Sequence, residues 1–176
     1  MPILLIINGY PGTGKSTIAS EFAKKNNFAL INQDIFLFQL NAFSENKLIN
    51  HQEHLVTIKN IHDCLLNYMH LNKNIVLEGA LVSISSKDPI NIIDFIKLGK
   101  KMGYKVVIIT LIAEKKVRIK RQKKRKYILP QKIDNKLCHA VSKINKKIDD
   151  EIIIDSSNYS IKTTLQKIEK IISEFD

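Results

Sequence analysis

Short runs of Ile, Leu and Val alternate along the chain with longer stretches in which apolar residues recur every three or four positions. The short runs predict buried β-strands, because near-continuous aliphatic residues suit strands that are covered on both faces. These runs cover residues 3–7, 28–31, 75–77, 105–112 and 151–154. Strands of this kind are typical of a parallel sheet.

The longer stretches have the spacing of amphipathic helices. They cover residues 16–25, 55–69, 90–101, 117–126, 132–148 and 161–175, and Ser160 is the expected N-cap of the last one. Strand and helix alternate throughout, which predicts an α/β fold with right-handed crossovers. No repeat, linker or composition boundary interrupts the pattern, so we expect one domain over residues 1–176.

Composition agrees with a globular protein and narrows its class. Hydrophobic residues make up 44% and charged residues 26% of the 176 positions, which excludes intrinsic disorder. No apolar run approaches the roughly 18 residues that a membrane span needs, and the first residues do not resemble a signal peptide. Cys64 and Cys138 are the only cysteines, which favours a cytoplasmic location without disulfides.

A glycine-rich motif directly follows the first predicted strand. It fits G-x-x-x-x-G-K-[ST] in the strand–loop–helix setting that a P-loop requires, as Gly9-Tyr10-Pro11-Gly12-Thr13-Gly14-Lys15-Ser16. Backbone amides of such a loop, together with the following helix N-terminus, bind phosphates. We therefore predict that the motif and Thr17 bind ATP, that Lys15 reaches the β- and γ-phosphates, and that Ser16 binds Mg²⁺.

Two carboxylates end neighbouring predicted strands. Asp34 follows the second strand, where it could accept a proton from an acceptor hydroxyl, or merely cap the next helix. Glu78 ends the third strand, where it could hold Mg²⁺ directly or through water, or be an ordinary surface acid. Gly79 would leave room there for a ligand to approach.

The net charge of +11 is concentrated in one segment. Residues 115–126 hold nine basic residues and no acid, and they include all three arginines of the chain, Arg118, Arg121 and Arg125. Spacings of three and four place the arginines on one helical face. We predict a lid over residues 114–130, with Arg118 binding the nucleotide and Arg121 and Arg125 stabilising the transferred phosphoryl group.

These features favour a kinase among P-loop proteins. The guanine-binding pattern N-K-x-D of GTPases is absent from the sequence, and motor ATPases are usually larger. The leading hypothesis is transfer of a phosphoryl group from ATP to a hydroxyl. A nucleotide-dependent binding module without transfer activity is the alternative of another class.

The chain resembles P-loop kinases, and most of all the 5′-kinase domain of phage-type polynucleotide kinases. The likeness covers roughly residues 1–140 and rests on residues 6–17, 22–26 and 31–34, on Lys120-Arg121 to Arg125, and on Pro130. It implies a sheet of order 2-3-1-4-5, Mg-ATP as donor and a nucleic-acid 5′-hydroxyl as acceptor. It also implies that Asp34 is the general base and that Arg125 is the lid arginine, with Arg121 before it.

The sequence leaves a second acceptor class open. The chain is also similar to zeta-toxin-like and small-molecule P-loop kinases, whose acceptors are nucleosides, nucleotide-sugars, antibiotics or metabolites. Leu37 stands where polynucleotide kinases usually have an arginine for the acceptor phosphate, and this favours a small acceptor. The basic segment favours a polyanionic acceptor instead, although the same charge could simply close over ATP.

Overall fold

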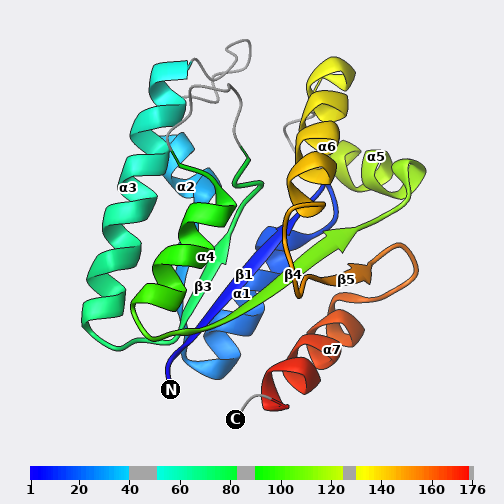
Figure 1. Ribbon diagram of the computed structural model, residues 1–176. Helices are drawn as coiled ribbons and strands as arrows, with labels where there is room; N and C mark the ends of the chain where they lie inside the picture. The colour runs from blue at the N-terminus through cyan, green and yellow to red at the C-terminus, as the bar shows by residue number, and fades with distance from the viewer. Residues whose placement is uncertain (40–50, 83–89, 125–129, 175–176) are drawn as a thin grey trace.

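The computed structural model describes residues 1–39, 51–82, 90–124 and 130–174, and its centre is a five-stranded parallel sheet. The strands lie in the order β2-β3-β1-β4-β5 (Figure 1), which confirms the expected order. Their bounds are Ile3–Gly9 for β1, Ala29–Asn32 for β2, Ile75–Glu78 for β3, Lys105–Ile112 for β4 and Ile152–Asp155 for β5.

Seven helices of the described ranges accompany the sheet. They are α1 (Lys15–Asn26), α2 (Gln33–Gln39), α3 (His51–His70), α4 (Ile92–Lys101), α5 (Lys115–Lys123), α6 (Gln131–Asn145) and α7 (Ile161–Ser173). The predicted cap of α7 is confirmed, because Ser160 Oγ accepts a hydrogen bond from Thr163 N at 3.1 Å. None of these helices is both long and apolar enough to cross a membrane.

Several boundaries differ from the predicted ones, and local hydrogen bonds explain two of them. Helix α4 begins at Ile92 rather than at residue 90, because Asn91 and Asp94 form a capping box. Strand β2 begins at Ala29, since Phe28 N still donates to Ala23 O at the end of α1. Helix α5 starts two residues earlier than predicted, and α6 ends three residues earlier.

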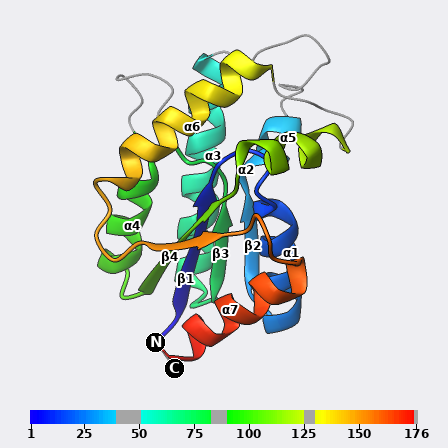
Figure 2. The ribbon, with the colours of Figure 1, turned by 90° about the vertical axis from the view of Figure 1, so that its right-hand side faces the viewer.

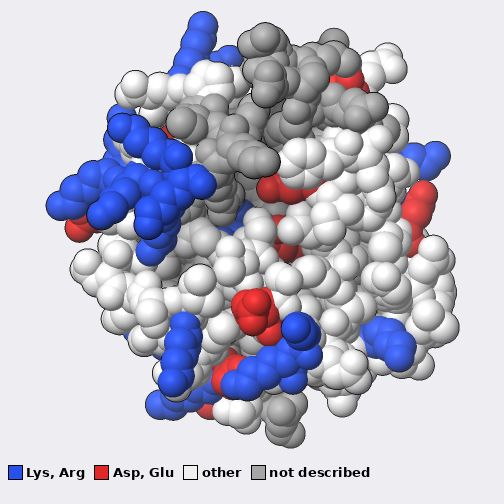
Figure 3. All heavy atoms as spheres, turned by 180° about the vertical axis from the view of Figure 1, so that it is seen from behind, with Lys and Arg blue, Asp and Glu red and all other residues white. Residues whose placement is uncertain are grey.

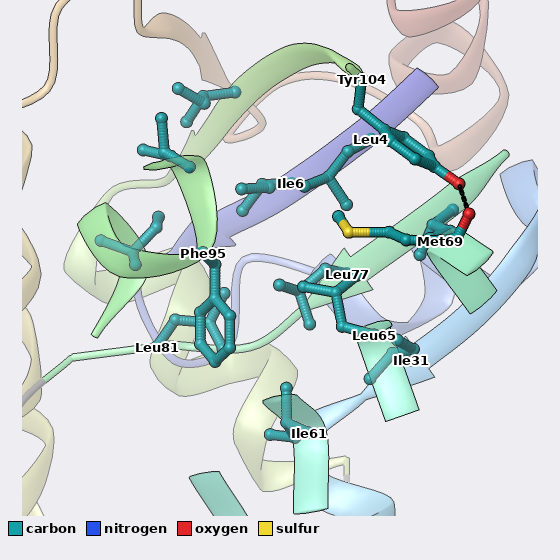
Figure 4. Packing of buried hydrophobic residues seen from close by; sticks show 14 of the residues in the cluster. Leu4, Ile6, Ile31, Ile61, Leu65, Met69, Leu77, Leu81, Phe95 and Tyr104 are labelled. Atoms are coloured by element: carbon teal, nitrogen blue, oxygen red, sulfur yellow. Dashed lines mark hydrogen bonds between the residues drawn. The ribbon is translucent and has the colours of Figure 1, made fainter. Parts of the chain in front are cut away.

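Two hydrophobic cores lie on opposite faces of the sheet, so the molecule has three layers (Figure 2). One core joins the sheet to α3 and α4 and includes Leu4, Ile6, Ile61, Leu65, Met69, Leu77 and Phe95 (Figure 4). The other joins the sheet to α1 and α7 and includes Ile7, Ile18, Phe22, Leu111 and Ile168. Because both faces are covered, the strands carry continuous aliphatic runs, as the sequence pattern indicated.

The parallel register brings the carboxyl ends of the strands to one edge. Ile7 of β1 pairs with Glu78 of β3, and Glu78 pairs with Asn32 of β2. On the other side of β1, Gly9 pairs with Leu111 of β4. Helices α2, α5 and α6 lie toward this edge (Figures 1 and 2), and ligands of open α/β sheets bind there.

Candidate active site

The glycine-rich loop lies between the end of β1 and the start of α1. Gly9, Gly12 and Gly14 have φ of +138°, +79° and +98°, values that L side chains rarely adopt. Gly14 is the N-cap of α1 and no side chain caps this helix. The first-turn amides of α1 can therefore donate to an anion, which is what phosphate binding requires.

The two reactive side chains of the loop are held by nearby oxygens. Lys15 Nζ donates to Tyr10 O at 3.2 Å, so the ammonium group lies over the loop that it follows. Ser16 Oγ donates to Glu78 Oε1 at 3.3 Å. The structure thus brings together the two residues that were predicted to hold Mg²⁺, although 62 positions separate them in the sequence.

Glu78 is an interior residue. Only 2% of it is exposed, so the alternative interpretation of a surface acid is wrong. Carboxylate and hydroxyl oxygens are ligands that Mg²⁺ accepts, and this ion usually takes its remaining ligands from water and substrate phosphates. The described residues contain no group of three or more His, Cys, Asp or Glu side chains that could hold a metal ion alone. The Ser16 hydroxyl and the Glu78 carboxylate are of the ligand types that fit Mg²⁺.

Asp34 is the second residue of α2 and is exposed. Its side chain is not the cap of this helix, which corrects the alternative prediction. Asn32 supplies the cap, since its Oδ1 accepts from Asp34 N at 2.8 Å and from Ile35 N at 3.3 Å. The Asp34 carboxylate is therefore not needed for capping.

Gln33 is a second anchor of this helix, and no pattern in the sequence indicated this role. Gln33 is 7% exposed, and its Oε1 accepts from Ala80 N at 3.0 Å and from Leu81 N at 3.3 Å. A Cβ at Gly79 would lie 2.7 Å from Gln33 Cβ. Gly79 therefore makes room for Gln33, and not for a ligand as predicted.

The two described arginines of the basic segment face the protein interior. Arg118 Nη1 donates to both carboxylate oxygens of Asp134, at 2.9 and 3.0 Å, and to Pro11 O at 3.1 Å. Arg121 donates to Thr13 O at 3.2 Å and to Ser156 Oγ and O at 3.0 and 2.7 Å. Arg125 lies outside the described residues, so its place in a lid stays a prediction.

Asp134 is the main site residue that sequence reasoning missed. It is buried on α6 together with Val141, seven positions later, so the two lie on one helical face. The sequence could have indicated the burial of Asp134, because this acid shares a helical face with the apolar residue Val141. Burial raises the pKa of the neighbouring Cys138 thiol, whose Sγ lies 3.9 Å from Asp134 Oδ2.

The basic residues of helix α5 differ in exposure. Arg118 is 5% exposed, whereas the lysines of the helix and its C-cap are exposed, namely Lys115, Lys116, Lys120, Lys123 and Lys124. Figure 3 shows Lys and Arg side chains gathered over this helix, beside a hollow in the surface. We call these five residues the lysine face.

The sequence profile of one family matches residues 4–137, which include the loop, Glu78, α5 and Asp134. That profile describes an AAA domain. The chain belongs to this AAA domain family. No curated protein matches the AAA domain described here.

Solved structures of kinases share the fold of this AAA domain. A sugar kinase from Janibacter sp. has a TM-score of 0.71 at 12% identity, with 98% of this chain and 95% of that chain covered. A gluconokinase from Sinorhizobium meliloti has a TM-score of 0.60 at 12% identity, with 94% and 88% covered. A shikimate kinase from Aquifex aeolicus has a TM-score of 0.61 at 13% identity, with 98% and 97% covered. The P-loop kinase fold is thereby confirmed, whereas closeness to phage-type polynucleotide kinases stays a prediction.

Proposed function

We propose that this AAA domain transfers the γ-phosphoryl group of ATP to a hydroxyl of a small molecule. The observation that carries the proposal is the arrangement at the sheet edge. An uncapped helix N-terminus, the Ser16–Glu78 pair and the exposed Asp34 follow the neighbouring strands β1, β3 and β2. Phosphate binding, metal binding and proton abstraction each have a residue there.

Two observations favour a small acceptor. The kinases of the same fold are named for sugar, gluconate and shikimate. Leu37, at the position where polynucleotide kinases usually have an arginine, is 4% exposed and belongs to the interior. A buried leucine has no donor for an acceptor phosphate.

Each residue has a defined task in the proposed reaction. The loop amides and Lys15 bind the phosphates, and Ser16 and Glu78 hold Mg²⁺. Asp34 accepts the proton of the acceptor hydroxyl as the hydroxyl oxygen bonds to the γ-phosphorus; the bond from this phosphorus to the β–γ bridging oxygen breaks, and ADP leaves. Arg125 is proposed to neutralise charge on the transferred group, as predicted from the sequence. Bound Mg-ATP supplies the phosphoryl group and the metal charge.

Phosphate transfer from γ-labelled ATP to a panel of sugars, sugar acids and nucleosides tests the proposal. Asp34→Asn should lower kcat by about 10²–10⁴-fold and leave the Kd for ATP unchanged, because it removes only the proton acceptor. Asp63→Asn removes an exposed carboxylate on α3 and should change neither value. Equal activity of Asp34→Asn and wild type would contradict the role of Asp34. ATP binding without transfer to any acceptor would favour the binding module.

The lysine face favours a second candidate, a nucleic-acid 5′-hydroxyl as acceptor. Within the described residues, its one ion pair is between Lys116 and Glu114, at 3.0 Å. Exposed lysines that contact phosphates release counterions, so binding weakens as salt rises.

The lysine face can be tested with 5′-hydroxyl RNA and DNA oligomers. Replacing Lys120, Lys123 and Lys124 with Gln should weaken oligomer binding and flatten its salt dependence. The matched control replaces three exposed lysines of α4, namely Lys97, Lys100 and Lys101. Equal oligomer binding by both triple variants would contradict this candidate. Label on oligomers rather than on small molecules would favour it over the small acceptor.

A further inference from the structure

Two carbonyl oxygens of the P-loop, those of Pro11 and Thr13, are bound by residues from other parts of the protein. A loop that turns its N–H groups inward turns its C=O groups outward, and buried C=O groups need donors. Tyr10 O is bound within the loop itself, since it accepts from Thr13 Oγ1 at 2.8 Å and from Lys15 Nζ at 3.2 Å. Pro11 O accepts from Arg118, and Thr13 O accepts from Arg121 and from Ser156 Oγ.

These donors are themselves held in place. Asp134 binds Arg118 through both of its oxygens, and Gln122 Nε2 donates to Asp134 Oδ1 at 3.1 Å. Arg118, Asp134 and Gln122 are each no more than 6% exposed. Ser156 is 1% exposed, and its backbone N donates to Ile112 O at 2.8 Å, so the turn after β5 is fixed to the end of β4.

Helix α5 also contacts the loop through its backbone. A Cβ at Gly12 would lie 2.9 Å from Arg118 O and 3.1 Å from Gln122 Cγ. The Arg118 guanidinium carbon lies 5.5 Å from the centre of the Tyr10 ring, within cation–π distance. The conformation of the loop is therefore coupled to the position of α5.

We propose that Arg118, oriented by Asp134, and Arg121, oriented by Ser156, are positioning residues that hold the P-loop in its phosphate-binding conformation from the carbonyl side. This inference rests on the proposed function, because it assigns the loop to a nucleotide. It replaces the predicted contacts of Arg118 and Arg121 with phosphates. In this proposal, the part of α5 up to Gln122 keeps a fixed position against the P-loop.

Nucleotide affinity separates this role from a phosphate contact. An arginine that touches the γ-phosphate strengthens binding of ATP but not of ADP. A residue that shapes the loop affects both nucleotides alike. Arg118→Gln should therefore raise the Kd for ATP and for ADP by the same factor, about tenfold or more.

Asp134 provides the sharper test, because a carboxylate cannot attract a phosphate. Asp134→Asn should reproduce the loss of ATP and ADP affinity seen in Arg118→Gln. The double variant, Arg118→Gln with Asp134→Asn, should bind ATP and ADP about as weakly as either single variant, because each single substitution already removes the same Arg118–Asp134 interaction. Lys136→Gln is the matched control, an exposed lysine on the same helix as Asp134, and should bind like wild type.

Hydrogen exchange of the loop amides gives a readout that does not depend on chemistry. In the absence of nucleotide, the amide protons of residues 12–14 should exchange with solvent faster in Asp134→Asn than in wild type. Unchanged exchange together with unchanged affinity would overturn the proposal. A loss of ATP affinity alone in Arg118→Gln would overturn it in favour of the predicted phosphate contact.

A milder variant covers the case in which the ion-pair variants do not fold. Gln122→Ala removes one hydrogen bond to Asp134 and should weaken ATP and ADP equally, by a few fold. Unchanged affinity in Gln122→Ala would then overturn the proposal. Failure of the proposed function can be distinguished from failure of the positioning role. In that case the wild-type protein itself would bind neither ATP nor ADP, or would bind both and transfer phosphate to no acceptor.

Discussion

The proposed donor side and the proposed acceptor side of the site are built differently. On the donor side, the P-loop is bound by α5, by the turn after β5 and, through Arg118, by α6. On the acceptor side, Asp34 is exposed, and its helix is anchored through Asn32 and Gln33. A phosphate site must hold several backbone amides in one conformation, whereas a general base is a single carboxylate that must reach the acceptor hydroxyl. The two sides should therefore respond differently to substitution.

Gly12→Ala should have the largest effect, on the donor side. The new methyl group would meet Arg118 O of α5 at 2.9 Å, and nucleotide affinity should fall by about 100-fold or more. Gly103→Ala is a matched control, because Gly103 has φ of +77° against +79° for Gly12, with nothing within 4 Å of its Cβ position. It should cost only about 1 kcal/mol of stability. Isothermal titration with ADP and thermal unfolding measure both. Equal loss of affinity in the two variants would show that backbone strain alone is responsible.

Gln33→Ala should affect the acceptor side without changing nucleotide binding. It leaves the amides of Ala80 and Leu81 without their acceptor, which costs about 1–3 kcal/mol. Because α2 carries Asp34, kcat should fall while the Kd for ADP stays the same. Steady-state transfer and ADP titration separate these quantities. A parallel loss of ADP affinity would show that the two sides are coupled.

Asn32→Ala should have a smaller effect, since it removes only the cap of α2. Loss of a side-chain cap costs about 0.5–2 kcal/mol. Ser160→Ala removes the cap of α7, away from the sheet edge, and should cost a similar amount in denaturant unfolding. Only Asn32→Ala should lower the transfer rate. Equal transfer rates in the two variants would mean that the cap does not position Asp34.

Glu151→Gln should have the smallest effect and lies outside both sides of the site. Burial raises the pKa of Glu151, although the hydroxyl of Thr110 donates to its carboxylate. A raised pKa means that the folded state holds this proton more tightly than the unfolded state. The wild type therefore gains stability as pH falls through the folded pKa, and loses that gain as pH rises. The variant should lack this dependence, which lies above the usual titration range of a Glu carboxyl. Denaturant unfolding of wild type and Glu151→Gln at several pH values checks this prediction. Identical dependence of stability on pH in the two proteins would contradict it.

The sequence predicted the fold because its signals are local. Aliphatic runs and helical spacings depend on neighbours within a few positions, and the strand order followed from the resemblance to P-loop kinases. The loop, Ser16, Glu78 and Asp34 were predicted for the same reason, since each follows directly from a strand end. The boundaries were less accurate, because a helix start such as that of α4 depends on a few side-chain hydrogen bonds, here those of Asn91 and Asp94.

By itself, the sequence determined a parallel α/β sheet, a phosphate-binding loop and a helical face that carries Arg118 and Arg121. Only the tertiary structure decided what that face meets. Arg118 contacts Pro11, 107 positions away, and Ser156 contacts Thr13, 143 positions away. Spacing along a helix fixes which side chains share a face, but the partners come from elements that the fold brings alongside. For this reason the arginines could be grouped from the sequence, whereas their binding to loop carbonyls and to Asp134 could not.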